Sequence, residues 1–106
     1  MQIAKEAYKL TSRLPATEQF GLVSQMRRAA VSLPSNIAEG FRRRNENEFR
    51  QFLHVALGSA AELETQVQLC KELHGFDTTE IKKFLELLDH FQAMTMSLIK
   101  KLGVNT

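Results

Sequence analysis

The feature that most constrains the fold is a stripe of apolar residues between positions 49 and 70, spaced alternately four and three residues apart. Its members are Phe49, Leu53, Ala56, Ala60, Leu63, Val67 and Cys70. This spacing averages 3.5 residues, which is the period of the seam between helices packed in bundles and coiled coils. Asn45 with Glu48 three residues later is a variant of the capping box, and Gly75 is a typical residue after a helix end. The segment is therefore predicted to form one helix of about 28 residues.

Three further segments carry apolar stripes with helical spacing. The first is expected to end before Pro15, because the residue preceding a proline is disfavoured in helical conformation. The second is expected to begin with Thr17 as its N-cap and to end at Gly40 in a left-handed C-cap. The fourth is expected to begin at Asp77, with Glu80 completing a second capping pair. In chain order the stripes are Ile3, Ala7, Leu10 and Leu14; Val23, Met26, Ala30, Leu33 and Ile37; and Ile81, Phe84, Leu88, Phe91, Thr95, Leu98 and Leu102.

The fold class predicted from these stripes is all-α, because no segment alternates with period two over a useful length. Short connections make successive helices antiparallel neighbours, which gives an up-down-up-down four-helix bundle as a single domain over residues 1–106. The first helix is short, at roughly half the length of the third. Either the bundle is open at one end, or another element such as a symmetric neighbour covers the groove. Further apolar residues lie outside the main stripe of the third helix, which suggests that a second face of this helix is covered by a partner. These residues are Phe52, Val55, Leu57, Leu69 and Leu73.

The composition limits the compartment and the chemistry. The single cysteine, Cys70, excludes an internal disulfide and is expected to be a small buried packing residue. No signal peptide and no apolar run of membrane-spanning length are apparent, so we expect a cytoplasmic protein with no membrane partner. His54, His74 and His90 lack ligand spacing on one helix, and no Glu-x-x-His pair, phosphate-binding glycine loop or nucleophile motif is found. We therefore expect no catalytic residue, no cofactor and no metal.

The net charge of +2 conceals an uneven distribution. Residues 1–44 carry eight Lys and Arg against three Glu, a net charge of +5, whereas residues 45–106 carry six Lys and Arg against nine Asp and Glu, a net charge of −3. Such an asymmetry suggests an anionic partner, although the two halves could equally attract each other within the fold or between subunits. The candidate nucleic-acid-binding residues are Arg42, Arg43, Arg44, Arg27 and Arg28.

The run Arg42-Arg43-Arg44 follows the expected end of the second helix. The helix dipole favours cations there, but one helix end does not account for three adjacent arginines. The forked guanidinium group is well suited to phosphate contacts, and an oligomer would repeat the run as a multivalent surface. Phe41 is the one aromatic residue close by in the sequence, which favours recognition of shape or backbone over stacking of single bases.

Pro34 stands inside the second apolar stripe. A proline within a helix costs roughly 3 kcal/mol, and it leaves the carbonyl group of Ala30 without its donor. The side chains of Ser32, Ser35 and Asn36 are expected to satisfy that carbonyl group. Pro34 is thus predicted to be a kink device that sets how this helix meets its neighbours.

Polar residues are interleaved with the apolar stripes of the second and third helices. Arg27 or Arg28 is expected to pair with Glu62 or Glu64 across a helix interface. Such a network would fix register and subunit contacts more than it would add stability. The candidate structural and oligomer-contact residues are Gln25, Ser32, Pro34, Ser35, Asn36, Glu62 and Glu64.

Three stretches together resemble a known family: residues 20–40, the motif Glu48-Phe49-x-x-Phe52-Leu53, and residues 56–66. The sequence is similar to the bacterial four-helix-bundle family of 23S rRNA intervening-sequence proteins, which in turn is similar to the accessory proteins of diversity-generating retroelements. The resemblance implies a homopentamer with a basic surface that binds RNA or DNA, and, by analogy with the retroelement relatives, partnership with a reverse transcriptase. It implies no catalytic residues. The family usually has further residues before the position of Ile3.

Two functional hypotheses follow. The leading one is a non-enzymatic homo-oligomeric bundle that binds nucleic acid, in particular structured RNA, through its basic surface. The alternative is a structural or adaptor module for protein–protein interaction, in which the polar residues of the second and third helices form contacts between subunits. The two hypotheses assign Arg27 and Arg28 to different roles.

Overall fold

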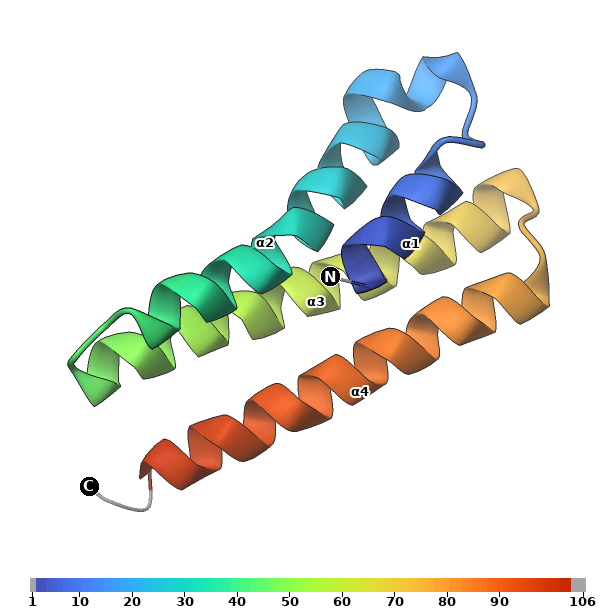
Figure 1. The fold of residues 1–106 in the computed structure, drawn as a ribbon. Helices are drawn as coiled ribbons and strands as arrows, with labels where there is room; N and C mark the ends of the chain where they lie inside the picture. Colours follow the sequence, from blue (N-terminus) through green and yellow to red (C-terminus); the bar gives the residue numbers. More distant parts are fainter. Residues whose placement is uncertain (1, 104–106) are drawn as a thin grey trace.

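The structure is a computed structural model that describes residues 2–103. Four α-helices follow one another as α1 (Gln2–Thr11), α2 (Ser24–Phe41), α3 (Glu46–His74) and α4 (Thr78–Gly103). A short 3-10 helix (Ala16–Glu18) and a π-helical turn (Gln19–Val23) precede α2, and the described residues contain no strand. Successive helices run antiparallel, as Figure 1 shows, so the predicted all-α four-helix bundle with a short first helix is confirmed.

Asn45, Gly75 and Asp77 cap the ends of α3 and the start of α4 as the sequence predicts. Glu80, which was predicted to complete the capping pair of Asp77, instead forms an ion pair with Arg13, because the first turn of α4 faces the residues after α1. The side-chain oxygen of Asn45 accepts hydrogen bonds from the backbone N–H groups of Asn47 at 2.7 Å and Glu48 at 3.3 Å. Gly75 follows the helix in the left-handed conformation with φ of 65°, which a residue without a Cβ adopts at little cost. Asp77 accepts from the backbone N–H of Thr79 at 3.2 Å. Local capping therefore fixes where α3 begins and ends and where α4 begins.

The start of the second helical segment differs from the prediction. Thr17 is not an N-cap, because the chain becomes helical directly after the extended Pro15, with ψ of 156°, and Thr17 lies inside the 3-10 turn. The π-helical turn Gln19–Val23 then leads without a break into α2. The prediction of Thr17 as a cap is wrong because helix formation begins immediately after Pro15.

Gly40 does not form the predicted left-handed C-cap. Gly75 is the one residue with positive φ among those described, and Gly40 is a buried helical residue of α2. A Cβ atom at Gly40 would lie 2.8 Å from Cδ1 of Phe49 and 3.2 Å from Cβ of Phe52. The glycine thus permits α2 and α3 to approach closely, and the prediction is wrong because close packing, not backbone conformation, is what this position requires.

Pro34 lies inside α2, which continues through it. The helix changes direction along its length in Figure 1, in agreement with the effect of a proline on the preceding turn. The side-chain amide of Asn36 donates to the carbonyl oxygen of Ser32 at 2.8 Å, and not to that of Ala30 as predicted. The amide prefers Ser32 because an asparagine side chain in a helix lies over the backbone one turn before it.

The hydrophobic core is formed by members of the predicted stripes of all four helices. The stripe residues Ile37, Phe49, Phe91, Leu98 and Leu102 are only partly buried. Cys70 is fully buried in it, with its Sγ 3.5 Å from Sδ of Met26. Desolvation by burial, with a contribution from the charge of Glu18, raises the pKa of the Cys70 thiol to about 11. The largest fully buried side chains are Leu10, Met26, Leu33, Leu53, Leu63 and Leu88.

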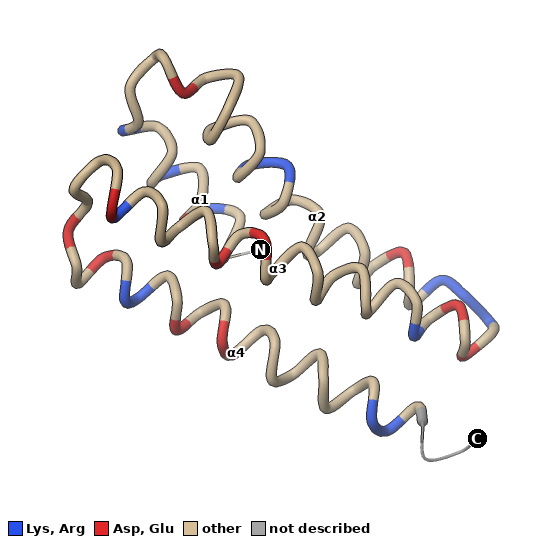
Figure 2. The backbone as a smooth tube through the Cα atoms, turned by 180° about the vertical axis from the view of Figure 1, so that it is seen from behind, with Lys and Arg blue, Asp and Glu red and all other residues tan. Residues whose placement is uncertain are grey.

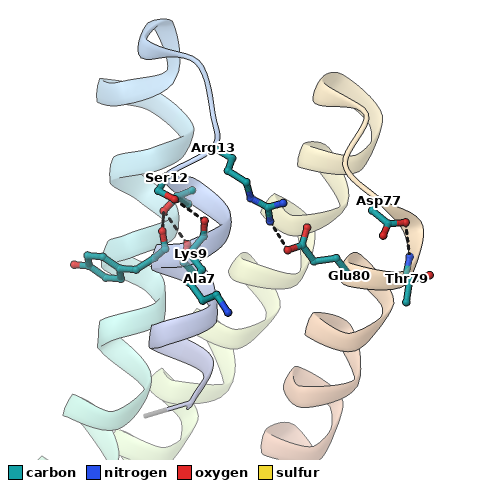
Figure 3. A network of polar contacts seen from close by, with 9 residues as sticks. Ala7, Lys9, Ser12, Arg13, Asp77, Thr79 and Glu80 are labelled. Atoms are coloured by element: carbon teal, nitrogen blue, oxygen red, sulfur yellow. Dashed lines mark hydrogen bonds and ion pairs between the residues drawn. The ribbon is translucent and has the colours of Figure 1, made fainter.

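Because α1 has 10 residues and α3 has 29, α1 covers one part of the bundle and leaves the other part with three helices (Figure 1). We call the end with the connections 12–15 and 75–77 the closed end. There, Arg13 forms an ion pair with Glu80 between the residues after α1 and the first turn of α4 (Figure 3). His74 of α3 contacts Glu18 of the 3-10 turn at 2.8 Å.

We call the opposite end, which contains the connection 42–45 and the last turn of α4, the basic end. Phe41, Met94 and Met96 are exposed in the C-terminal halves of α2 and α4. None of the described helices is long and apolar enough to cross a membrane.

Candidate nucleic-acid interface

The three consecutive arginines lie in the connection that joins α2 to α3. Backbone hydrogen bonds from Arg42 N to the Glu39 carbonyl (3.2 Å) and from Arg43 N to the Gly40 carbonyl (3.0 Å) close the last turn of α2. The N-cap Asn45 then starts α3. The connection is therefore short and held at both sides, and it presents the arginines at one end of the bundle (Figure 2).

Arg43 differs from its two neighbours because its side chain packs on the protein. Its Nη2 donates to Oε2 of Glu39 at 2.7 Å, and its guanidinium group lies 4.9 Å from the centre of the Phe52 ring. Arg42 and Arg44 are exposed, and neither makes an ion pair with any of residues 2–103. The geometry therefore assigns Arg43 to the turn, whereas the guanidinium groups of Arg42 and Arg44 are exposed and have no acidic partner among the described residues.

Further charges gather at the same end. Lys100 and Lys101 lie in the last turn of α4, and the antiparallel topology brings this turn to the basic end, as Figure 2 shows. Glu46 and Glu48 lie in the first turn of α3, where the helix dipole favours acidic side chains. The proximity of these lysines to the arginines follows from the antiparallel topology and was not predicted from the sequence.

An aromatic cluster lies directly beside the arginines. The rings of Phe41 and Phe49 are 5.0 Å apart between centroids and inclined at 46°. Phe41 is nevertheless 65% exposed, whereas Phe49 and Phe52 are partly buried. The sequence interpretation considered Phe41 alone, because the packing of α3 against the end of α2 brings the other two rings close. The feature of the sequence that could have indicated this cluster is Gly40, the residue next to Phe41, because a glycine permits close approach of another helix.

Arg27 does not belong to this surface. Its Nε donates to Oγ1 of Thr11 at 2.9 Å, and its guanidinium group lies 4.4 Å from the centre of the Tyr8 ring. Both partners are in α1, so Arg27 fastens α1 to α2. The predicted pairing of Arg27 or Arg28 with Glu62 or Glu64 is wrong within this chain, because Arg27 faces α1 and Arg28 forms no ion pair among the described residues.

Several of the predicted contact residues come together on a second surface, between α2 and α3. A shallow depression of about 390 Å³ is lined by Gln25, Arg28, Ala29, Ser32, Ser59 and Glu62, and we call it the α2/α3 depression. The hydroxyl groups of Ser32 and Ser59 are hydrogen-bonded at 2.8 Å across the two helices, and the side-chain amide of Asn36 donates to Oγ of Ser32 at 2.8 Å. Pro34, Ser35 and Glu64 do not line this depression.

Another depression, of about 710 Å³, is lined by residues of α1 and α4. Its lining mixes acidic and basic side chains with an apolar floor that includes Leu10, Phe84 and Leu87. Among residues 2–103 no group of three or more His, Cys, Asp or Glu side chains is arranged to hold a metal ion.

The fold and these surfaces define the class of protein as a small antiparallel four-helix bundle with a basic end. The chain belongs to the family of 23S rRNA-intervening sequence proteins, whose model matches residues 1–97. Its fold is similar to that of a crystallised protein of unknown function from the S23 ribosomal protein family of Bacteroides thetaiotaomicron, with a TM-score of 0.75 and 18% sequence identity over 92% of this chain and 98% of that chain. No curated protein matches the sequence.

Proposed function

We propose that the protein is a non-enzymatic nucleic-acid-binding bundle that recognises structured RNA through its basic end. The observation that supports this function is the presence of two exposed arginines, Arg42 and Arg44, that no acidic side chain among residues 2–103 neutralises. They are held on a short, capped connection, so little conformational freedom of the backbone is lost when a ligand binds. Arginine binds phosphate oxygens with two parallel hydrogen bonds, which suits it to a nucleic-acid backbone.

The surrounding charges are consistent with this role. Glu39 is engaged by Arg43, and Lys100 and Lys101 add two cations to the same end. Glu46 and Glu48 oppose this charge, but they lie beside the N-terminus of α3, whose dipole partly compensates them. An oligomer of the kind that the family resemblance implies would repeat the basic end and raise the affinity through multivalent contact.

Filter-binding titrations of a stem-loop RNA over a range of salt concentrations test this function. Each phosphate contact releases counterions, so the double variant Arg42→Ala/Arg44→Ala should reduce the slope of log K against log salt by about 1.4 to 1.8. The matched control is Lys82→Ala/Lys83→Ala, which removes the same charge from α4 near the closed end. Equal losses in both variants, or the absence of binding by the wild type at low salt, would contradict the proposal.

A second candidate function is supported by the α2/α3 depression. Arg28 and Glu62 line it from opposite helices without forming an ion pair, and Val55, which lies four residues before Ser59 on the same side of α3, is 52% exposed. Hydrogen-bonding groups with apolar flanks are typical of a protein–protein interface. On this proposal the face contacts another copy of the chain, or a partner protein such as a reverse transcriptase by analogy with the retroelement relatives.

Light scattering of the variant Arg28→Glu tests the second candidate. Placing an acidic side chain opposite Glu62 should reduce the mass of the assembly, whereas Arg44→Glu, which makes the same charge change at the basic end, should leave it unchanged. A wild-type protein that is monomeric at micromolar concentration would exclude self-association through this face.

A further inference from the structure

We infer that Phe41 is a stacking platform for an unpaired nucleobase, so that the basic end recognises single-stranded segments such as loops or bulges and not continuous duplex. This inference rests on the proposed nucleic-acid binding and names the form of nucleic acid that is bound. It is carried by the position of an exposed aromatic ring directly beside the arginines that are available to phosphates.

The ring of Phe41 is both accessible and supported. It is 65% exposed at the last residue of α2, which leaves one part of the ring for a ligand. On the protein side it packs against Phe49 with ring centroids 5.0 Å apart. Phe49 in turn lies against Gly40, where a Cβ atom would come within 2.8 Å of its ring. The absence of a side chain at Gly40 is therefore what permits Phe49 to support Phe41.

The neighbouring charges provide the second part of such a site. Arg42 follows Phe41 directly in the chain, and Arg44 lies two residues further on. Arg43, between them, is held against Glu39 and over the ring of Phe52, so the connection is anchored at its middle. A base stacked on Phe41 would leave its own phosphate groups close to Arg42 and Arg44. Proteins that bind single strands combine cations for the backbone with aromatic rings for the bases in this way.

The geometry favours an unpaired base over a duplex because the faces of paired bases are covered by their neighbours in the stack. The A-form duplex displays phosphates, 2′-hydroxyl groups and a shallow minor groove, and it offers no free face to an aromatic ring. Loops and bulges offer such faces, and each base–aromatic stack contributes substantially to affinity with little dependence on sequence.

The chain also provides a matched control. Phe20 is 94% exposed, but it lies in the π-helical turn near the closed end. If exposed phenylalanine rings contributed to binding through general hydrophobicity, then Phe20→Ala and Phe41→Ala would have similar effects. If Phe41 is a stacking platform because it lies beside the arginines, only Phe41→Ala weakens binding.

The experiment compares three labelled oligonucleotides of equal length by fluorescence anisotropy: a single-stranded RNA, its blunt-ended duplex, and an abasic strand that has the phosphates without the bases. The wild type should bind the single strand more tightly than the abasic strand by about 5- to 150-fold, the range expected for one stacked base. Phe41→Ala should lose this preference and keep its affinity for the abasic strand. The salt slope on the abasic strand should be unchanged, because no charge is removed.

Two further variants complete the test. Phe20→Ala should retain the preference of the wild type. Phe41→Trp should also retain it, and, since the chain contains no tryptophan, its fluorescence should be quenched by the single strand and not by the abasic strand. Circular dichroism and light scattering establish that each variant is folded and assembled as the wild type is.

The outcomes separate this inference from the proposed function. If the wild type binds none of the three oligonucleotides at low salt, nucleic-acid binding itself is wrong. If it binds them all equally, or if Phe41→Ala keeps the preference for bases, binding stands and the stacking platform is wrong. A changed assembly mass in Phe41→Ala would identify Phe41 as a contact between subunits and would likewise overturn the inference.

Discussion

The two ends of the bundle use their polar side chains differently. At the closed end these side chains connect separate elements, through Arg13–Glu80, Arg27–Thr11 and His74–Glu18. At the basic end the corresponding hydrogen bonds are local, from Arg43 to Glu39 within a turn and from Arg50 to Asn47 within α3. Exposed arginines and an exposed aromatic ring remain there. The difference indicates that polar contacts between elements are concentrated where four helices meet, whereas the three-helix end leaves cationic and aromatic groups exposed.

The largest effect is expected from removing a core side chain at the closed end. Leu10 of α1 is 2% exposed, so Leu10→Ala should lower the free energy of unfolding by about 2 to 5 kcal/mol in urea titrations followed by circular dichroism. Phe41→Ala at the basic end should cost about 1 kcal/mol or less, because most of the ring is already in solvent. Leu10→Met, which conserves volume, serves as the control. Equal costs at the two ends would contradict the comparison.

The next effect concerns pH and the buried thiol of Cys70. In the folded protein its pKa is about 11, against an ordinary value of 9.0, so between these two values the unfolded chain loses the proton first. Stability should therefore fall as the pH rises through this range, by about 2 to 3 kcal/mol in total. Comparing urea midpoints at both ends of the range for the wild type and Cys70→Ala isolates the thiol, since all other groups are common to both. Parallel pH profiles would show that the thiol is not desolvated.

A smaller effect is expected at the junction between α1 and α2. Arg27→Ala removes a hydrogen bond to Thr11 and the contact with Tyr8, and should cost about 1 to 2 kcal/mol. Arg28→Ala, the adjacent exposed arginine, should change stability by less than about 0.5 kcal/mol. Thermal unfolding of both variants measures the difference. If Arg28→Ala proved the more damaging, the assignment of Arg27 to the helix junction would be wrong.

The helix caps should contribute at both ends. Asn45 caps α3 at the basic end with two hydrogen bonds, and Asp77 caps α4 at the closed end with one. Replacement of either residue by alanine should cost about 1 kcal/mol, with the larger value for Asn45. Because the caps are local, the costs should add in the double variant within about 0.5 kcal/mol. A strong departure from additivity would mean that the two ends are energetically coupled.

The smallest effect is expected for the ion pair of Arg13 and Glu80. The two side chains are 52% and 33% exposed, so solvent screens their attraction. Arg13→Ala should cost about 1 kcal/mol or less, and the difference from the wild type should diminish in 1 M salt. A loss of stability that does not depend on salt would indicate that Arg13 stabilises the closed end by stacking and not by its charge. Its guanidinium carbon lies 5.2 Å from the centre of the Phe76 ring.

The sequence was sufficient for the fold because the signals involved are local. Apolar spacing predicted four helices, and Asn45, Asp77 and Gly75 cap them as expected. Gly40 was misassigned, because a glycine needed for close packing and a glycine needed for a left-handed turn look the same in the sequence.

The candidate site depended more on tertiary structure. Arg27 and Arg28 are adjacent in the chain, yet one contacts α1 and the other lines the α2/α3 depression. The different contacts of Arg27 and Arg28 depend on how α1 crosses α2. The apolar periodicity of a single helix carries no information about that crossing. For the same reason the pairing of Phe41 with Phe49 was not foreseen, since it arises where α3 turns back along α2.

The burial of Cys70 also determines how this protein can be labelled. It is the one cysteine of the chain, it is fully buried, and its thiol remains protonated at neutral pH. Maleimide and similar reagents react with thiolate, so the native residue will be inert while the bundle is folded. A cysteine introduced on the surface of either end would then be the single reactive position, without prior replacement of Cys70. Pairs of such positions would allow spectroscopic distances to be measured within the bundle.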